Sequence, residues 1–163
     1  MEKITRKPIV TAAINKCIEA YKANGLRECV AELDVTLLQN KVKFPLLEYA
    51  AHSFFECLPE QEQIEFCDQI AELKREGGNV ILGIMLQRRL PNHMLESFQK
   101  AREYIIAGEI WYVCDIIGER VFGFSLLNNP EETIPEIKKM SSHESHWVVR
   151  SLGAGSHLSL IHI

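Results

Sequence analysis

The chain has 163 residues, of which 47% are hydrophobic and 25% are charged, and its formal net charge is −4. This composition is that of one ordinary globular domain. The negative net charge argues against nucleic-acid binding through overall charge, because phosphate neutralisation needs clustered Lys and Arg. Neither a membrane span nor a signal peptide is expected, since no apolar run approaches ~18 residues. Five cysteines without a C-x-x-C pair are typical of a protein from the reducing cytoplasm.

The first half of the chain shows the spacing of amphipathic helices. Apolar residues recur at intervals near 3.6, prolines stand at three helix starts, and Asn24-Gly25 favours a helix end. Helices are therefore expected over residues 8–23, 26–39, 44–58 and 59–76. Gly77-Gly78 is the strongest predicted break in the chain.

The second half continues the helical pattern after that break. Asn79 is expected to cap a helix that runs to Leu90 and is apolar almost all round, which is typical of a buried helix. Pro91 and Pro130 favour fresh helix starts. Further helices are expected over residues 91–106, 109–127, 131–140 and 147–158.

These elements predict an all-α fold, because no alternating strand pattern of useful length appears. The helices pair as 44–58 with 59–76, 79–90 with 92–107, and 109–127 with 131–140. Each pair takes roughly 30 to 35 residues, the size of one α-solenoid unit. The expected architecture is an α-solenoid of antiparallel helix pairs in a single domain over residues 1–163, with an irregular helical bundle as the alternative.

The last residues do not fit the end of a solenoid. Residues 152–163 contain two glycines and finish in an apolar tail without a cap or a partner helix, whereas a solenoid needs an end unit with a polar outer face. We therefore expect a chain truncated at its C-terminus, partly non-native over 152–163, where the residues pack poorly and expose apolar surface.

Two helices near the C-terminus carry the candidate site. Trp111 and Asp115 are four residues apart and share one helix face, and Trp147 and Arg150 share a face in the same way. Asp and Arg are rarely buried unless they are paired, and an indole recognises cations. Structural alternatives remain open: Asp115 could pair with Arg120 or Arg150, and Trp147 could be a core anchor.

Other motifs point to no cofactor and no metal. The sequence has no phosphate-binding glycine loop and no nucleophile elbow. His143 and His146 have a spacing that could bind a metal, but no further ligand completes the set. Cys114 points away from Asp115 and is interpreted as a core residue, and Gly118 and Gly123 are expected to allow close helix packing.

The residues around this site resemble the DNA alkylation repair family, the AlkD-like HEAT-repeat DNA glycosylases. The resemblance covers residues 40–158 and is strongest over 109–151. The matching text is Trp111-x-x-x-Asp115, then Gly118-x-x-Val121-x-Gly123-x-x-Leu126, then Trp147-Val148-x-Arg150-Ser151.

The resemblance implies a stack of HEAT-like helix pairs that acts as a monomer on double-stranded DNA containing alkylated bases. It implies base-excision repair by hydrolysis of the N-glycosidic bond of cationic alkylated purines, of the 3-methyladenine and 7-methylguanine type, without metal or cofactor. Asp115 falls on the catalytic carboxylate and Trp111 on an aromatic that contacts the lesion nucleotide. Arg150 falls on a DNA-binding phosphate contact, with Trp147 beside it in the motif. Because some members of this fold bind DNA structures without excising bases, a non-catalytic module that binds DNA or protein partners is the alternative.

Overall fold

The computed structural model describes the backbone of residues 3–161 and the side chains of residues 3–156. In that range the chain is mostly helical, with two strands of two residues each, so the predicted all-α class is confirmed. The chain divides into two compact units, Met1–Met85 and Leu86–Ile163, and the division falls inside α5 (Glu76–Gly108). No helix among the described residues is both long enough and apolar enough to cross a bilayer.

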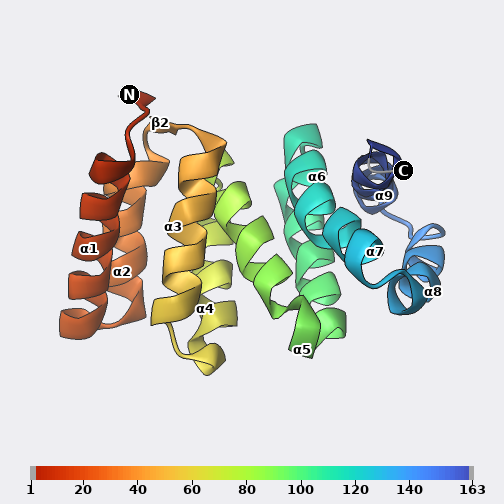
Figure 1. Ribbon diagram of the computed structural model, residues 1–163, viewed down its shortest axis with the longest axis horizontal. Helices are drawn as coiled ribbons and strands as arrows, with labels where there is room; N and C mark the ends of the chain where they lie inside the picture. The colour runs from red at the N-terminus through yellow and green to blue at the C-terminus, as the bar shows by residue number, and fades with distance from the viewer. Residues whose placement is uncertain (1–2, 162–163) are drawn as a thin grey trace. The chain divides into compact units, whose positions relative to one another are not determined.

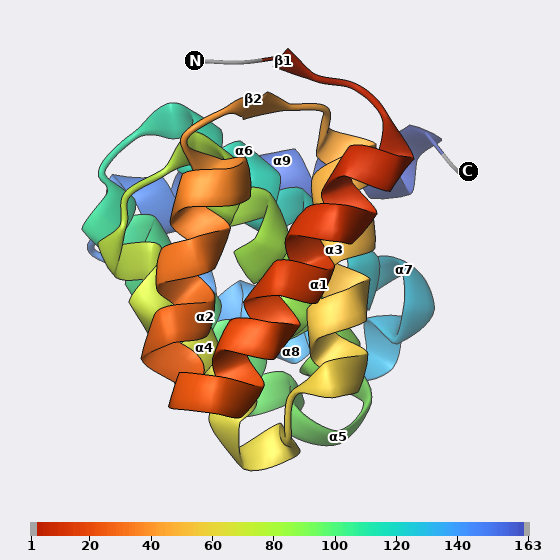
Figure 2. The same cartoon turned by 90° about the vertical axis from the view of Figure 1, so that its left-hand side faces the viewer.

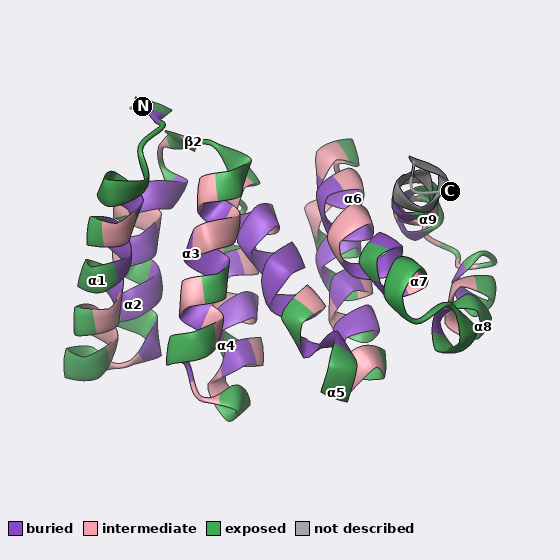
Figure 3. Ribbon diagram, in the orientation of Figure 1, coloured by how far each residue is buried: buried purple, intermediate pink, exposed green. Residues whose placement is uncertain are grey.

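The first unit begins with a helical hairpin. Helix α1 (Lys7–Asn24) is followed by α2 (Leu26–Leu33) and by the π-helix η1 (Asp34–Leu38). Gly25 joins the two α-helices with a φ of 87°, a conformation that glycine adopts without strain. Helices α1 and α2 lie side by side (Figures 1 and 2). Each buries one apolar stripe and exposes its other face, as Figure 3 shows.

A second pair of helices packs on this hairpin. Helix α3 (Phe44–Cys57) has Pro45 in its first turn, and α4 (Glu60–Glu72) starts directly after Pro59 with an acidic first turn. Phe54 and Phe66 join the two helices, with ring centroids 5.2 Å apart. Helix α3 contacts α1, and α4 contacts α2, so the two pairs stack within the unit. A short parallel ladder between β1 (Lys3–Ile4) and β2 (Lys41–Val42) completes the unit.

The predicted break at Gly77-Gly78 is wrong, because both glycines lie in the first turn of α5. The chain turns earlier, at Lys74, whose φ is 51°. A Cβ on Gly77 would lie 3.1 Å from Leu47 Cδ1, and one on Gly78 would lie 3.1 Å from Ile70 Cγ2. The two glycines therefore provide space for helix packing rather than a turn.

Asn79 also differs from the prediction, since it lies inside the first turn of α5 instead of capping a helix. Its amide donates hydrogen bonds to the carbonyls of Arg75 and Glu76, both at 3.2 Å.

The predicted break near Pro91 is confirmed two residues later, where His93 has non-helical backbone angles (φ −140°, ψ 45°). Proline removes a backbone donor and clashes with the preceding turn, which accounts for this kink.

After α5, the second unit contains a long helical segment interrupted by a π-helix, with two further helices packed on it. Residues 111–128 run through α6 (Trp111–Gly118), the π-helix η2 (Glu119–Gly123) and α7 (Phe124–Asn128). Helix α8 (Pro130–Met140) contacts α7, and α9 (His146–Ile161) packs against α6, η2 and α7. Phe98, in the second half of α5, meets Phe122 edge to face with ring centroids 5.0 Å apart.

Helix α9 corrects part of the expectation for the C-terminal residues. Gly155 is buried, and a Cβ there would lie only 3.0 Å from Gly118 O and Gly123 N. The chain is therefore closely packed at Gly155, where poor packing was expected. The apolar side chains of residues 158–163 lie outside the described residues.

Candidate functional site

Helix α6 presents Trp111 and Asp115 on one face, as their spacing predicts. The helix follows a tight connection in which Glu109 has a φ of 49°, and a Cβ on Gly108 would lie 2.9 Å from Val113 Cγ1. Trp111 is the first residue of α6 and is 57% exposed. An indole this exposed is unusual in a folded chain, and more than half of the residue is open to solvent.

Arg150 reaches Asp115 from α9, 35 residues further along the chain. Its Nη2 donates a hydrogen bond to Asp115 Oδ2 at 3.2 Å. The two side chains are 48% and 32% exposed, respectively, so the ion pair lies at the surface. The structure thus brings Asp115 and Arg150 into contact, which the sequence left open as one alternative. Of the two pairing partners considered for Asp115, the structure selects Arg150, whereas Arg120 donates to the Ile116 carbonyl.

Close packing of α9 on α6 holds Arg150 in this position. A Cβ on Gly118 would lie 2.5 Å from the carbonyl oxygen of Ser151, which is itself completely buried. Gly155, one turn further along α9, is similarly close to Gly118 and Gly123. The predicted role of Gly118 in helix packing is confirmed. Because Arg150 directly precedes Ser151, this packing also places the guanidinium against Asp115.

Trp147 lies in the first turn of α9 and is partly buried. Its ring centroid is 4.3 Å from that of His146, with the planes tilted by 39°. His143 accepts a hydrogen bond from the backbone N–H of Ser145 at 3.0 Å and so supports the turn before α9. A DNA-binding role for Trp147 stays a prediction.

Tyr112 is a neighbour of the site that the sequence spacing did not indicate. Its ring meets that of Trp111 edge to face, with centroids 5.9 Å apart and an interplanar angle of 83°. Consecutive helical residues point about 100° apart, so helical periodicity gives no signal for such a pair. The contact restricts the orientations available to the exposed indole.

Cys114 is buried, as predicted for a core residue. Burial raises the pKa of its thiol to about 11, against the opposing effect of Arg150. The thiol donates a weak hydrogen bond to the Ile110 carbonyl at 3.5 Å. It therefore stays protonated at neutral pH.

The site thus combines one carboxylate, one guanidinium and one exposed indole, all within the second unit. The described part of the chain contains no group of three His, Cys, Asp or Glu side chains arranged to hold a metal ion. No protein-family model, curated protein or solved structure matches the chain. Chemically, the three groups can stabilise a positive charge, bind an anion and stack on a planar cation.

Proposed function

We propose that this chain is a HEAT-like repeat protein that excises cationic alkylated purines from double-stranded DNA. The observation that carries the proposal is the Asp115–Arg150 pair at 3.2 Å, on the helix face that also presents the exposed Trp111. The resemblance over residues 109–151 assigns to these three residues the carboxylate, the phosphate contact and the lesion contact. The pairing supports these assignments because it brings two distant motif residues together at the surface.

Helix packing in the first unit supports the repeat architecture. The hairpin of α1 and α2 stacks on the pair α3 and α4, with α1 against α3 and α2 against α4. A HEAT-like array needs this stacking of neighbouring helix pairs, because one pair alone cannot bury its apolar face. The described pairs are therefore suited to serve as repeat units.

The proposed reaction asks little of the protein beyond electrostatics. An N-alkylated purine is already positively charged and is a good leaving group, so the sugar develops oxocarbenium character as the glycosidic bond breaks. The Asp115 carboxylate would stabilise this charge and orient the attacking water. The Trp111 indole would stack on the cationic base or sugar, and Arg150 would hold a backbone phosphate.

In this mechanism, DNA binding would break the ion pair between Asp115 and Arg150. In the free protein Arg150 pairs with Asp115, but nearly half of the Arg150 side chain is exposed to solvent. A DNA phosphate can compete for the same guanidinium through charge-assisted hydrogen bonds. Docking of the duplex would then release the Asp115 carboxylate as the sugar arrives beside it.

The test is release of free 7-methylguanine from methylated duplex DNA, compared between the natural chain and Asp115→Asn. Excision should slow by about 10- to 1000-fold, the loss expected for one electrostatic contact in the transition state. DNA affinity should not fall, because phosphate contacts carry most of the binding. Asp68→Asn, the same change on α4, is the matched control and should leave excision unchanged.

Arg150→Ala separates docking from chemistry. Losing one phosphate contact should weaken DNA binding and reduce the salt dependence of the association constant by about one unit of slope. Fluorescence anisotropy with a labelled duplex at several salt concentrations measures both effects. Arg27→Ala, at an exposed position of α2, is the control for nonspecific loss of charge.

A non-catalytic module that binds DNA structures or a protein partner is the second candidate. The observation that favours this candidate is that Arg150 occupies the Asp115 carboxylate, as it would in an ion pair that only stabilises the fold. Under this alternative Asp115→Asn lowers the free energy of unfolding, and the chain releases no methylated base. Measuring both quantities on the same variant distinguishes the two candidates.

A further inference from the structure

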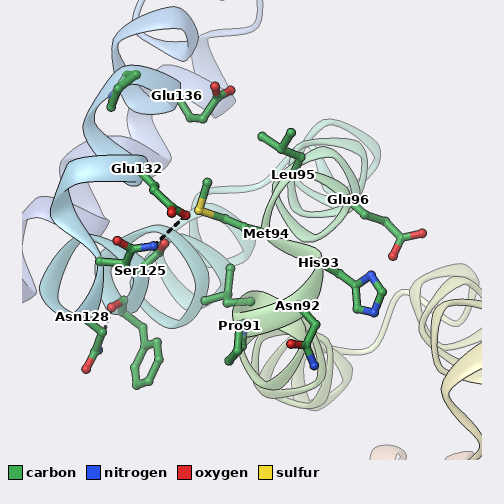
Figure 4. Close-up of a pocket in the computed structure, with 14 residues that line it drawn as sticks. Pro91, Asn92, His93, Met94, Leu95, Glu96, Ser125, Asn128, Glu132 and Glu136 are labelled. Atoms are coloured by element: carbon green, nitrogen blue, oxygen red, sulfur yellow. Dashed lines mark hydrogen bonds between the residues drawn. The ribbon is translucent and has the colours of Figure 1, made fainter.

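A cleft in the second unit lies apart from Asp115, where α5 breaks at His93. It has a volume of about 920 Å³ and is lined by residues 90–96 of α5 and by residues of α7 and α8. Volumes of about 300–1,000 Å³ are typical of ligand sites. Figure 4 shows Met94 and Leu95 on one side of the cleft and Glu132 and Glu136 on the other.

The cleft exposes large apolar side chains. Leu95 is 63% exposed although it is a large aliphatic residue, and Phe124, which also lines the cleft, is 38% exposed. Met94 lies beside Leu95 (Figure 4), and methionine adapts its shape to varied partners. Apolar side chains concentrated in one concave surface are typical of a recognition site.

The α8 side carries two of the three glutamates that line the cleft, Glu132 and Glu136, while the third, Glu96, lies on α5. None of the fourteen described residues that line the cleft is Lys or Arg. Glu96 is paired with Arg89 at 2.7 Å, and Glu136 forms an ion pair with Lys139. Glu132 accepts a hydrogen bond from the side-chain amide of Asn129 at 2.8 Å. Because this amide is neutral, the bond does not neutralise the negative charge of Glu132.

We propose that this cleft docks a basic amphipathic helical segment of a protein partner. Apolar residues on one face of the segment would cover Leu95 and Phe124, and its Lys or Arg residues would meet Glu132 at the opposite side. A helix in an apolar groove is a recurrent mode of peptide recognition, and complementary charge selects the partner. The Glu132 carboxylate also disfavours nucleic acid, because it repels phosphate groups.

The docking cleft does not depend on the proposed excision activity. Asp115 and Phe124 are nine residues apart along the helical segment formed by α6, η2 and α7, which places them roughly 13 Å apart along its axis. A segment bound at Leu95 can therefore be tested without reference to DNA. Failure of either proposal leaves the other standing.

The probe is a fluorescein-labelled peptide of about 16 residues with Leu on one helical face and Lys on the other, long enough to form a helix. A second peptide replaces Lys by Glu, and a third replaces Leu by Ser. Fluorescence anisotropy against the full chain should show saturable binding of the Leu/Lys peptide alone. Equal binding of the Leu/Glu peptide, or no binding of the Leu/Lys peptide, would overturn the proposal.

Variants then locate the binding. Leu95→Ser should weaken the Leu/Lys peptide by at least about tenfold, the effect of one lost apolar contact. Glu132→Gln should weaken it by about threefold, an effect that fades as salt is added. Ile134→Ser and Glu131→Gln change similar exposed residues of α8 that do not line the cleft, and they should leave binding unchanged.

Two further results would contradict the assignment. Binding that persists unchanged in Leu95→Ser would place the peptide elsewhere on the chain. A single-stranded DNA oligonucleotide that displaces the peptide, and that itself binds less well to Leu95→Ser, would make the cleft a nucleic-acid site. Because the Leu95 side chain is mostly exposed, this variant should fold, and its thermal melting curve verifies that it does.

Discussion

Gly118→Ala tests whether close packing of α9 on α6 holds the candidate site together. A Cβ at residue 118 would lie 2.5 Å from Ser151 O and 3.2 Å from both the carbonyl carbon and the Cβ of Ser151. The main obstacle is backbone on a packed helix, so no side-chain rotation can relieve the contact. Helix α9 must therefore move away from α6.

Two opposing energies set the size of the effect. Relieving the contact needs a shift of about 1 Å, because nonbonded heavy atoms prefer separations of about 3.5 Å or more. Overpacking of this kind costs about 1–3 kcal/mol. Alanine recovers about 1 kcal/mol of helix propensity over glycine. We expect a net loss of about 1–2 kcal/mol in the free energy of unfolding, because rigid backbone places the cost at the upper end of that range.

Chemical denaturation monitored by circular dichroism measures this loss, and Gly153→Ala is the matched control. Gly153 lies on α9, the other helix of this contact, and a Cβ there would have no atom of a packed neighbour within 4 Å. Alanine at residue 153 should therefore stabilise the chain by up to about 1 kcal/mol. The same substitution thus has opposite signs at two positions. If Gly118→Ala stabilises the chain as much as Gly153→Ala, the packing explanation is refuted.

Three further predictions concern single residues. Trp111→Ala should change the free energy of unfolding by less than about 1 kcal/mol, since the side chain is mostly exposed, while lowering base release in the excision assay. Among the five thiols, only exposed Cys57 should react rapidly with a thiol reagent at pH 8, because burial raises the pKa of Cys29, for example, to about 12. The hydrogen bond from Arg75 holds the pKa of Asp34 below its usual value. The ion pair therefore stabilises the fold at pH values above the ordinary pKa of Asp, and this stabilisation is lost as the pH falls through the lowered pKa of Asp34. The difference in unfolding free energy between the natural chain and Asp34→Asn should therefore be largest near neutral pH and should vanish in acid.

Local sequence determined the helices of this protein. Apolar spacing, the prolines at helix starts and Gly25 act within one or two turns, so they predicted most helix positions without knowledge of the packing. The same local reasoning failed at Gly77-Gly78, because the glycines there make room for Leu47 and Ile70 from other helices. A glycine that provides space between helices and one that ends a helix look alike in a sequence.

The candidate site likewise depends partly on local sequence and partly on the packing of distant residues. Helical period alone placed Trp111 and Asp115 on one face, since four residues make about one turn. Only the tertiary structure decided that Asp115 pairs with Arg150 rather than with Arg120, because that choice depends on how closely α9 approaches α6 at Gly118. The cleft at the α5 break likewise arises only when α7 and α8 pack beside Leu95. Contacts between residues far apart in the chain depend on packing geometry, which short-range sequence patterns do not encode.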